Sequence, residues 1–378
     1  MNKIPFNKPY MTGKELWYIS QAHHAGQLAG DSNYTKKCHQ WLENQTSCRK
    51  SLLTHSCTAA LEMCAILADL KPDDEVIMPS YTFVSTANAF VLRGAVPVFV
   101  DIRADTLNLD ETLIESAITE RTRAIVPVHY AGVGCEMDVI LDVAHRHNLM
   151  VIEDAAQGFW STYRQRPLGS IGNLATFSFH ETKNVISGEG GALLINDARF
   201  LERAEIIWEK GTNRSQFFRG MVDKYSWVDV GSSYLPSEIM AAFLWAQLEE
   251  AESITRTRLN IWHQYHSALE SLETQGYLRR PIVPDECEHN AHMYYILLSD
   301  LDKRTALIEF LKVLGISAVF HYVPLHSSPA GQRFSRASGE LKNTIELSDR
   351  LLRLPLFPEL TSHQIEQVID ALYKFFAI

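Results

Sequence analysis

A lysine in a polar segment is the first residue of this sequence whose surroundings suggest chemistry. Lys183 lies in Ser178-Phe179-His180-Glu181-Thr182-Lys183-Asn184, after an apolar run and before the glycine-rich Gly188-Glu189-Gly190-Gly191. Burial lowers the pKa of a lysine towards neutrality, and the neutral amine is a nucleophile that can form a Schiff base. Since most lysines are surface residues, this interpretation needs support from other segments.

An aspartate provides the second feature. The segment Glu153-Asp154-Ala155-Ala156-Gln157 directly follows the apolar run Leu149–Ile152. A carboxylate at the end of a buried strand is costly unless a cation or a hydrogen-bond donor faces it, so such residues are often functional. An aspartate that caps a helix explains the same pattern equally well.

A candidate anion site and an aromatic ring complete the set. The run Leu53-Thr54-His55-Ser56-Cys57-Thr58-Ala59-Ala60 places small residues and hydroxyls at a predicted helix start, where N–H groups and the helix dipole favour an anion. An ordinary helix cap is the alternative. The segment Pro79-Ser80-Tyr81-Thr82-Phe83 offers an aromatic ring, although such rings are more often part of a core.

The elements between residues 50 and 200 must position these four segments. The predicted strands are Glu75–Pro79, Val96–Ile102, Ala124–Tyr130, Leu149–Asp154, Ala175–Phe179 and Ala192–Ile195. The predicted helices are Thr58–Leu70, Val84–Leu92, Glu111–Ile118 (with Asp110 as its cap) and Met137–Arg146. This alternation predicts an α/β doubly wound sheet, in which ligands bind beyond the carboxyl ends of the strands.

The remainder of the chain does not continue this alternation of strands and helices. A charged helix (Asp197–Lys210) leads into a polar, aromatic-rich segment, Gly211–Gly231, which is expected to be a long functional or interface loop. After an apolar helix at Ser237–Leu248, the other predicted elements are helices at Glu249–Leu272, 303–314 and 362–376 and strands at Met293–Leu298 and Ser317–His321. We therefore expect a large α/β domain over residues 1–248 and a smaller α+β domain over residues 249–378.

Composition excludes several classes of partner. The 378 residues include 35 Lys and Arg against 45 Asp and Glu, a net charge of −10, which disfavours nucleic acids and anionic membranes. The six cysteines form no CxxC pair, as expected of free thiols in a reducing compartment. The most apolar stretch, Ala89–Val100, is far too short to span a membrane. We expect a soluble, cytoplasmic protein without membrane insertion.

Histidine spacing does not indicate a metal site. His289 and His292, and likewise His321 and His326, are closely spaced, but neither an HExxH motif nor a Cys/His cluster accompanies them. Solvated or substrate-contacting histidines explain the pattern better.

The four segments together match the needs of pyridoxal 5'-phosphate. Its phosphate binds at a helix N-terminus, and its ring stacks on an aromatic face. A carboxylate keeps the ring nitrogen protonated, and a lysine bonds to the aldehyde. The order of Cys57, Phe83, Asp154 and Lys183 along the predicted strand ends supplies each of these groups.

The chain also resembles a known family over nearly its whole length. It is similar to the DegT/DnrJ/EryC1/StrS family of nucleotide-sugar aminotransferases. The segments that carry the resemblance are Ser56–Leu61, Pro79–Phe83, Val100-Asp101, Pro127–His129, Glu153–Gln157, Ser178–His180 with Lys183, Gly188–Gly191 and His321–His326. The resemblance implies the aspartate-aminotransferase fold (fold type I), with a large, mixed, mostly parallel sheet domain and a smaller α+β C-terminal domain.

The resemblance also implies roles for individual residues. Lys183 would be the catalytic residue and the covalent anchor of the cofactor. The remaining implied cofactor contacts are Asp154 to the ring nitrogen, Gln157 to the ring hydroxyl, Phe83 to the ring face, and Cys57, Thr58 and Ser178 to the phosphate. Two positions depart from the family pattern. Cys57 stands where members often have glycine, and Ser233 stands where many have an asparagine that reaches the phosphate from the neighbouring subunit.

Within the family, three segments resemble members that act at C4 of a dTDP sugar. These segments are Ser56–Thr58, His180–Asn184 and Gly211–Phe218. The implied reaction transfers the amino group of L-glutamate to dTDP-4-dehydro-6-deoxy-D-glucose, giving dTDP-4-amino-4,6-dideoxy-D-galactose and 2-oxoglutarate for enterobacterial common antigen or O-antigen synthesis. Transfer to C3, or the 4-amino-glucose epimer as product, remains open. A 3-dehydratase would lack the lysine, and a non-catalytic regulatory protein would not need it.

Substrate contacts and assembly follow from the charge pattern. Arg214 and Arg219 lie in the long predicted loop of an otherwise acidic chain, and arginine pairs well with phosphate oxygens. We expect them, with His321, Tyr322 and His326, to bind the sugar nucleotide. A loop of this kind predicts a homodimer with shared active sites.

Overall fold

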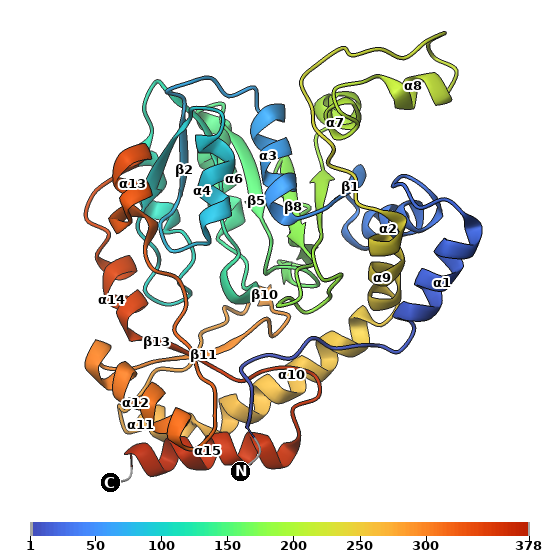
Figure 1. Cartoon of the computed structure of the whole chain (residues 1–378). Helices are drawn as coiled ribbons and strands as arrows, with labels where there is room; N and C mark the ends of the chain where they lie inside the picture. Colours follow the sequence, from blue (N-terminus) through green and yellow to red (C-terminus); the bar gives the residue numbers. More distant parts are fainter. Residues whose placement is uncertain (1–2, 377–378) are drawn as a thin grey trace.

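The largest element of the fold is an eight-stranded sheet. The computed structural model describes residues 3–376, and Figure 1 shows the sheet with helices packed around it. In spatial order its strands are β1 (Lys50–Thr54), β9 (Gly191–Ile195), β8 (Leu174–Ser178), β5 (Met150–Asp154), β4 (Thr122–Ile125), β2 (Glu75–Pro79), β3 (Val96–Val100) and β12 (Arg336–Ala337). Only β9 runs antiparallel to its neighbours β1 and β8. The predicted mixed, mostly parallel sheet is therefore confirmed.

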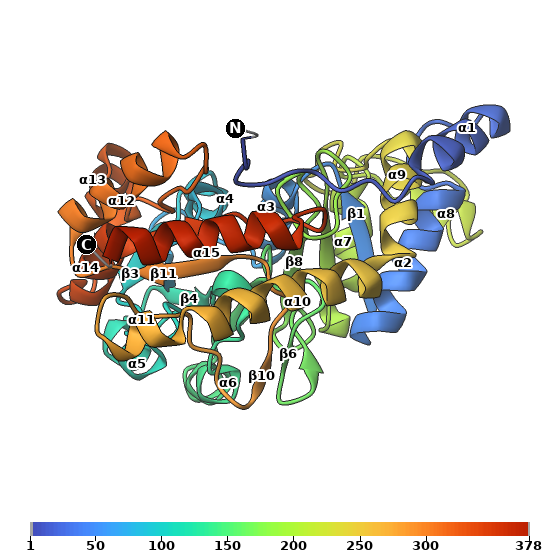
Figure 2. The ribbon, with the colours of Figure 1, turned by 90° about the horizontal axis from the view of Figure 1, so that it is seen from below.

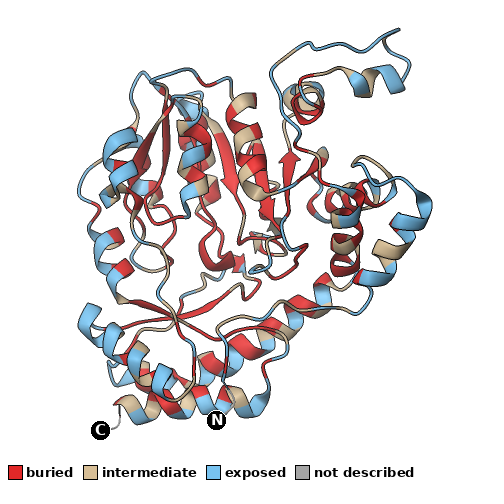
Figure 3. Cartoon of the chain, viewed as in Figure 1, coloured by how far each residue is buried: buried red, intermediate tan, exposed pale blue. Residues whose placement is uncertain are grey.

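Both faces of this sheet are covered by helices. Strand β2 illustrates the alternation. Val76 and Met78 join the core under α3 (Cys57–Leu67) and α4 (Val84–Val91), whereas Ile77 joins the core on the opposite face under α6 (Met137–Arg146). Figure 3 shows the resulting buried strands between helices whose outer faces are exposed. The helices around the sheet are α1 (Glu15–Ala25), α2 (Asn33–Thr46), α3 (Cys57–Leu67), α4 (Val84–Val91), α5 (Ile114–Ala117), α6 (Met137–Arg146), α7 (Leu201–Trp208), α8 (Arg214–Phe218) and α9 (Glu238–Leu248). A strand covered on both faces must be apolar throughout, as these mostly are.

A second core lies beyond α9. It is built on a two-stranded antiparallel sheet, β11 (Tyr294–Leu297) and β13 (Leu351–Leu354). The helices in this part of the chain are α10 (Ala251–Ala268), α11 (Glu270–Thr274), α12 (Leu301–Val313), α13 (Pro329–Phe334), α14 (Lys342–Arg350) and α15 (Ser362–Phe376). Figure 2 shows α10 and α15 lying side by side. Ile4 also packs into this core, although the domain division at residue 248 remains a prediction.

A small three-stranded sheet connects the two parts. It consists of β10 (Cys287–Glu288), β6 (Thr162–Tyr163) and β7 (Arg166–Pro167). None of the helices within residues 3–376 combines the length and the apolar character that crossing a membrane requires.

Several predicted elements differ from the structure. The strand predicted at Ala124–Tyr130 ends at Ile125, before Pro127, which has no N–H to donate to a sheet. Only Val319 of the predicted strand Ser317–His321 forms a bridge, to Arg353, while β13 is the partner of β11. The leucine-rich β13 was missed because short apolar runs do not distinguish strand from helix.

The helical predictions also need correction. The long helix predicted at Glu249–Leu272 is divided into α10 and α11 at Leu269. The segment Gly211–Gly231 is not wholly irregular, because it contains the short helix α8. Helices α1 and α2, at the start of the chain, were not predicted.

Candidate active site

The start of helix α3 lies against strand β9 at the edge of the sheet. The Ala59 N–H donates to Ser56 Oγ (3.1 Å), which caps the helix, and the N–H groups of the first turn have no acceptor within the helix. A Cβ added to Gly191 would lie 2.4 Å from Cys57 N, so only glycine allows β9 this close. The result is a narrow cradle of N–H groups at a helix N-terminus, which suits an anion such as phosphate.

Hydroxyl groups surround this cradle. Thr58 Oγ1 lies 2.7 Å from Ser85 Oγ, and Ser178 is buried at the end of β8, where it pairs with Gly191. Burial raises the pKa of the Cys57 thiol to about 12, so the thiol stays protonated and adds no negative charge beside the cradle. The donor set therefore fits the phosphate of pyridoxal phosphate.

Asp154 lies at the end of β5 and is 4% exposed. Thr86 Oγ1 donates to its Oδ2 (2.7 Å), and the Ala156 N–H donates to its Oδ1 (3.1 Å). Thr82 Oγ1 in turn lies 2.8 Å from Thr86 Oγ1. These donors hold the carboxylate in one orientation, with a cavity beside it.

Gln157 is fixed from two sides. The Ala131 N–H donates to its Oε1 (2.7 Å), and its Nε2 donates to the hydroxyl of Tyr322 (2.8 Å). Tyr322 comes from the second core, so this bond joins the two parts of the chain at the site. The buried amide still faces the cavity.

Lys183 follows β8 in a tight turn, where its N–H donates to His180 O (2.9 Å). Burial lowers the pKa of its amine, and the positive charge of Arg353 lowers it further, whereas the carboxylate of Asp154 raises it. A lowered pKa increases the fraction of neutral amine, which is the form that attacks a carbonyl carbon.

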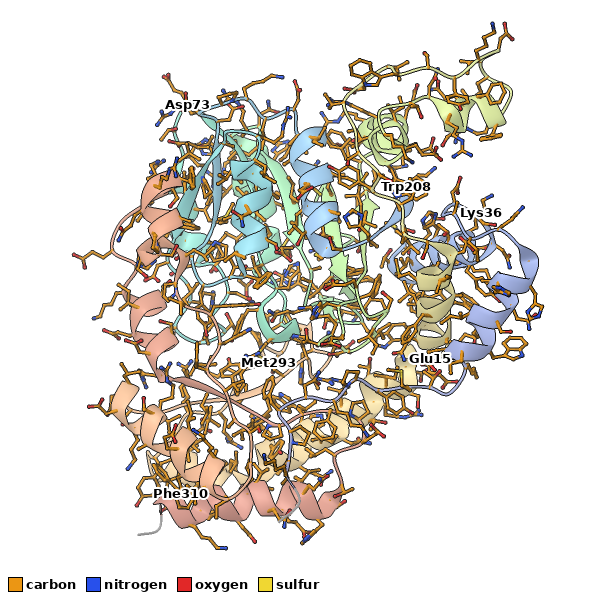
Figure 4. All side chains as sticks on the ribbon, viewed as in Figure 1. Glu15, Lys36, Asp73, Trp208, Met293 and Phe310 are labelled. Atoms are coloured by element: carbon orange, nitrogen blue, oxygen red, sulfur yellow. The ribbon has the colours of Figure 1, made fainter. Side chains whose placement is uncertain are left out.

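These residues line one cavity of about 580 Å³ between the sheet edge and the second core. Met293, labelled in Figure 4, is one of the residues that line it. Of the residues that the sequence predicted for the site, the cavity brings together Cys57, Thr58, Phe83, Asp154, Gln157, Ser178, Lys183, His321 and Tyr322. Phe83 is 56% exposed, with its ring 6.3 Å from that of Tyr322, so one ring face remains open to a ligand.

Four predicted residues lie outside this cavity. Arg214 and Arg219 pair with Glu209 and Glu205 of their own chain, and Ser233 is exposed beside Glu209. In these positions, none of the three lines the cavity of its own chain.

His326 is the fourth of these residues. Its Nδ1 lies 2.8 Å from Ser80 Oγ, so the side chain is held away from the cavity. His321 differs, because its Nδ1 lies 2.8 Å from the Tyr130 hydroxyl and its ring stacks on Tyr322 at the cavity wall.

Several cavity residues escaped sequence analysis. Phe6, Thr86, Arg258 and Arg353 all line the cavity. A charged residue within the otherwise apolar run Leu351–Leu354 was a usable signal for Arg353. The position of Phe6 depends on how the N-terminal segment packs, which local sequence does not encode.

Metal binding finds no support in the geometry. Within residues 3–376, no three His, Cys, Asp or Glu side chains gather in an arrangement that could hold a metal ion.

The fold and the site define a pyridoxal-phosphate-dependent transferase of the aspartate-aminotransferase type. Residues 9–373 match the DegT/DnrJ/EryC1/StrS aminotransferase family, and the chain belongs to that family. It is therefore a sugar aminotransferase that uses pyridoxal phosphate.

Individual proteins are similar to this chain over most of its length. The uncharacterized protein MJ1066 of Methanocaldococcus jannaschii is 35% identical over 348 residues, which cover 90% of this chain and 89% of that protein. The spore coat polysaccharide biosynthesis protein SpsC of Bacillus subtilis is 31% identical over 376 residues, covering 97% and 96%. Spr1654 from Streptococcus pneumoniae, in its PLP form, is 26% identical with a TM-score of 0.91, covering 99% and 98%.

Proposed function

We propose that this enzyme transfers the amino group of L-glutamate to C4 of dTDP-4-dehydro-6-deoxy-D-glucose, giving dTDP-4-amino-4,6-dideoxy-D-galactose and 2-oxoglutarate. Amino transfer is supported by the observation that Lys183, Asp154 and the α3 cradle lie in one cavity. The choice of sugar is supported by the resemblance around Cys57, Lys183 and Arg214 to the enterobacterial dTDP-4-dehydro-6-deoxy-D-glucose transaminase. That enzyme serves the synthesis of enterobacterial common antigen, which is the role we propose here.

Each cavity residue has a distinct part in holding the cofactor. We assign the phosphate to Cys57, Thr58 and Ser178, because they surround the N-terminus of α3. Asp154 would pair with the ring nitrogen, because its carboxylate is the buried negative charge of the cavity. The remaining assignments are Gln157 to the ring hydroxyl, Phe83 to the open ring face and Lys183 to the aldehyde.

The reaction proceeds in two halves that use the same lysine. Pyridoxal phosphate, when bound, supplies an aldehyde that takes up an amino group and a ring that withdraws electrons. In the first half, Lys183 Nζ would remove the proton from Cα of L-glutamate. The amino group stays with the cofactor, and water supplies the keto oxygen of the 2-oxoglutarate that leaves. In the second half, Lys183 Nζ delivers a proton to C4 of the sugar. Asp154 would stabilise the positive ring nitrogen throughout, as a buried fixed charge.

Two other products remain as alternatives. The amino group could go to C3 of a 3-keto isomer, or to the opposite face of C4 to give the 4-amino-glucose epimer. These outcomes depend on the orientation of the sugar and not on the chemistry of Lys183. Incubating the enzyme with L-glutamate and dTDP-4-dehydro-6-deoxy-D-glucose and identifying the product by NMR tests the proposal. An axial amino group at C4 supports it, while an equatorial one or substitution at C3 contradicts it.

We predict that the active enzyme is a homodimer. The segment 211–231 exposes several large apolar side chains, among them Phe218 (68%), Met221 (66%) and Trp227 (81%). Exposed apolar groups that cluster in this way mark interaction sites. Sedimentation at assay concentration should give twice the mass of the chain, and Trp227→Asp should shift the equilibrium towards monomer with loss of activity. A fully active monomer would contradict the prediction.

A second prediction concerns the two arginines of this segment. If Arg214 and Arg219 reach the partner's site, changing either to alanine should weaken the sugar-nucleotide half-reaction about tenfold or more, as expected for charge-assisted bonds to phosphate. The L-glutamate half-reaction should change little. Each half is followed separately from the absorbance of the cofactor.

Arg199→Ala is a matched control, since Arg199 is also a surface arginine paired with a carboxylate of its own chain, that of Asp197. It should affect neither half-reaction. Equal losses in both halves for the Arg214 and Arg219 variants would mean that these arginines are structural, through their pairs with Glu209 and Glu205.

We also propose that the enzyme is cytoplasmic. All six cysteines are free, and five of them are buried, which is typical of a protein that folds in a reducing compartment. Fractionation of cells of the source organism would test this.

A further inference from the structure

A second cavity lies outside the active site. It has a volume of about 660 Å³ and is lined by the end of α2, the segment that follows β5, β10 and the first half of α10. Figure 2 shows α10 beside β6 and β10, which both contribute to the lining. No described residue lines both this cavity and that of the active site. A hollow of this size can hold a small molecule, and none of the roles assigned above uses it.

Three aromatic rings line this second cavity. The centre of the Trp41 ring lies 5.6 Å from that of Trp160 and 5.9 Å from that of Phe159, with interplanar angles of 25° and 16°. The centres of the Phe159 and Trp160 rings lie only 6.2 Å apart, so these two rings do not sandwich Trp41 between them. One face of the Trp41 ring is therefore free of both aromatic neighbours. Trp41 and Trp160 are partly exposed, as expected of an apolar surface that a ligand can reach.

The backbone at Trp160 has an unusual conformation. The Ser161 N–H donates to Gly158 O (3.1 Å), which closes a four-residue turn with Trp160 as its third residue. Trp160 has a φ of 65°, a value at which this position of a turn usually holds glycine or asparagine. A bulky side chain there is unfavourable, and Asn290 helps to hold the turn, because its Nδ2 donates to Phe159 O (2.6 Å). Strained residues that the surrounding structure holds in place cluster at ligand sites.

Polar groups without partners lie among these aromatic residues. Ser161 and Thr255 are 1% and 3% exposed, and the hydroxyl oxygen of each has no hydrogen-bond partner within residues 3–376. Such groups are uncommon in folded proteins and point to a bound water or ligand. Burial lowers the pKa of His289 to about 4, so its ring stays neutral. The Ala291 N–H donates to His289 Nδ1 (3.1 Å), so the ring proton is on Nε2, which is a donor.

The charges around the second cavity narrow the class of ligand. Apart from histidines, its ionisable lining residues are Glu252, Glu288 and Arg256, two carboxylates against one guanidinium, so the balance is negative. Arg256 Nη1 lies 4.0 Å from Glu252 Oε1, and both side chains are largely exposed, so this pair is weak. A phosphate or a carboxylate gains nothing from such a lining. These charges therefore disfavour an anionic ligand.

An uncharged pyranose fits these features better than other compact ligands do. The C–H groups of its apolar face suit the negative face of an indole ring. Each of its hydroxyls can donate one hydrogen bond and accept two, which matches a lining with donors such as His289 Nε2 and Asn260 and with carboxylate acceptors. A nucleotide would bring its phosphate to the carboxylates of Glu252 and Glu288. A cation binds best where rings surround it, whereas Trp41 is stacked on its neighbours.

We propose that the second cavity is a binding site for an uncharged pyranose, stacked on Trp41 and Trp160 and hydrogen-bonded to His289 Nε2 and to the carboxylates at the rim. This site is separate from the proposed transfer reaction, because Lys183 lies in the other cavity. The inference therefore goes beyond the proposed function, and it stands even if the sugar assigned to that reaction is wrong.

The test measures sugar binding by the enzyme loaded with pyridoxal phosphate. Methyl β-D-glucopyranoside, methyl β-D-galactopyranoside and N-acetyl-D-glucosamine are titrated separately, and binding is followed by calorimetry and tryptophan fluorescence. We expect at least one of them to bind with a Kd on the order of millimolar or tighter. Trp160→Ala should weaken this binding about tenfold or more, because it removes a stacking surface. Adenosine and adenosine 5'-phosphate should bind at least about tenfold more weakly than the pyranose.

Trp17→Ala is the matched control. Trp17 is also an accessible tryptophan packed against an aromatic neighbour, Tyr18, but it lies in α1 and lines neither cavity. This variant should bind the pyranose like the wild type, and melting curves verify the fold of each variant. If Trp160→Ala does not fold, Glu252→Ala tests the same site, because the Glu252 side chain is largely exposed and its loss leaves the core intact. It should weaken pyranose binding about tenfold, as expected for a hydrogen bond to a charged group.

Three results would overturn the proposal. Failure of every pyranose to bind at concentrations up to about 100 mM would show that the cavity takes no such ligand. Pyranose binding that is unchanged in both Trp160→Ala and Glu252→Ala would place the sugar elsewhere, such as in the active site. Tighter binding of adenosine or its phosphate, lost in Trp160→Ala, would make the cavity a nucleotide site instead.

Discussion

Replacing Lys183 with alanine should reduce amino transfer at least ~100-fold in both half-reactions, because a positioned acid–base group contributes 10²–10⁴-fold to a rate. The change removes both the covalent anchor and the group that moves the proton. The turn around residue 183 should survive, since it is held by the backbone bond from Lys183 N to His180 O and by Asn184, whose Nδ2 donates to Asn290 O.

The measurement follows each half-reaction by absorbance, together with circular dichroism and a melting curve to verify the fold. Lys36→Ala serves as the control, because Lys36 is an exposed lysine of α2, labelled in Figure 4 far from Met293 and the cavity. The control should keep wild-type rates. Residual activity of Lys183→Ala above about one hundredth of wild type would count decisively against the role of Lys183.

The site residues that could be predicted from the sequence are those positioned by the order and direction of the strands. Asp154 and Ser178 end neighbouring parallel strands, and Cys57 begins the helix that follows β1. Strands that run in the same direction bring their carboxyl ends to one edge, so residues far apart in the sequence meet there. Lys183 joins them because the turn after β8 is short. Apolar runs and the residues that follow them were therefore sufficient to predict that these residues lie close together.

The part that was missed depends on packing between distant segments. Thr86 contacts Asp154 because α4 begins beside the end of β5, and Arg353 reaches the cavity because β13 pairs with β11. Phe6 approaches from the N-terminal segment. The periodicity of apolar residues in a helix or a strand does not predict these contacts, because they depend on how the two cores pack together.

The prediction of the fold likewise succeeded where the hydrophobic pattern is clear and failed where it is not. Strand β1 was missed although it is central to the site, since its sequence, Lys50-Ser51-Leu52-Leu53-Thr54, is polar at three of five positions. The polar side chains are nevertheless accommodated: Ser51 Oγ donates to His39 O and Thr54 Oγ1 donates to Ser56 O. Satisfied hydrogen bonds allow polar residues in a buried strand, and a pattern based on hydrophobicity cannot detect them.

Replacing Asp154 with asparagine should have the second largest effect, a loss of at least ~100-fold in both half-reactions with little change in structure. Asparagine has the same shape, and its Oδ1 can accept the hydrogen bond that Thr86 Oγ1 now donates to Asp154. What it lacks is the negative charge. Without that charge, the buried site no longer stabilises a protonated ring nitrogen, and electrons are withdrawn less effectively from the carbon that Lys183 deprotonates.

Glu153→Gln is a neighbouring comparison, because Glu153 is also fully buried but binds His129 and the N–H groups of Gly169, Ile171 and Gly172 on the other side of the strand. Its loss should appear mainly as a lower melting temperature, since it removes a buried charge from its donors. Activity of Asp154→Asn within tenfold of wild type, at full cofactor loading, would mean that another group supports the ring nitrogen. A drop confined to the melting temperature would instead make Asp154 a structural residue like Glu153.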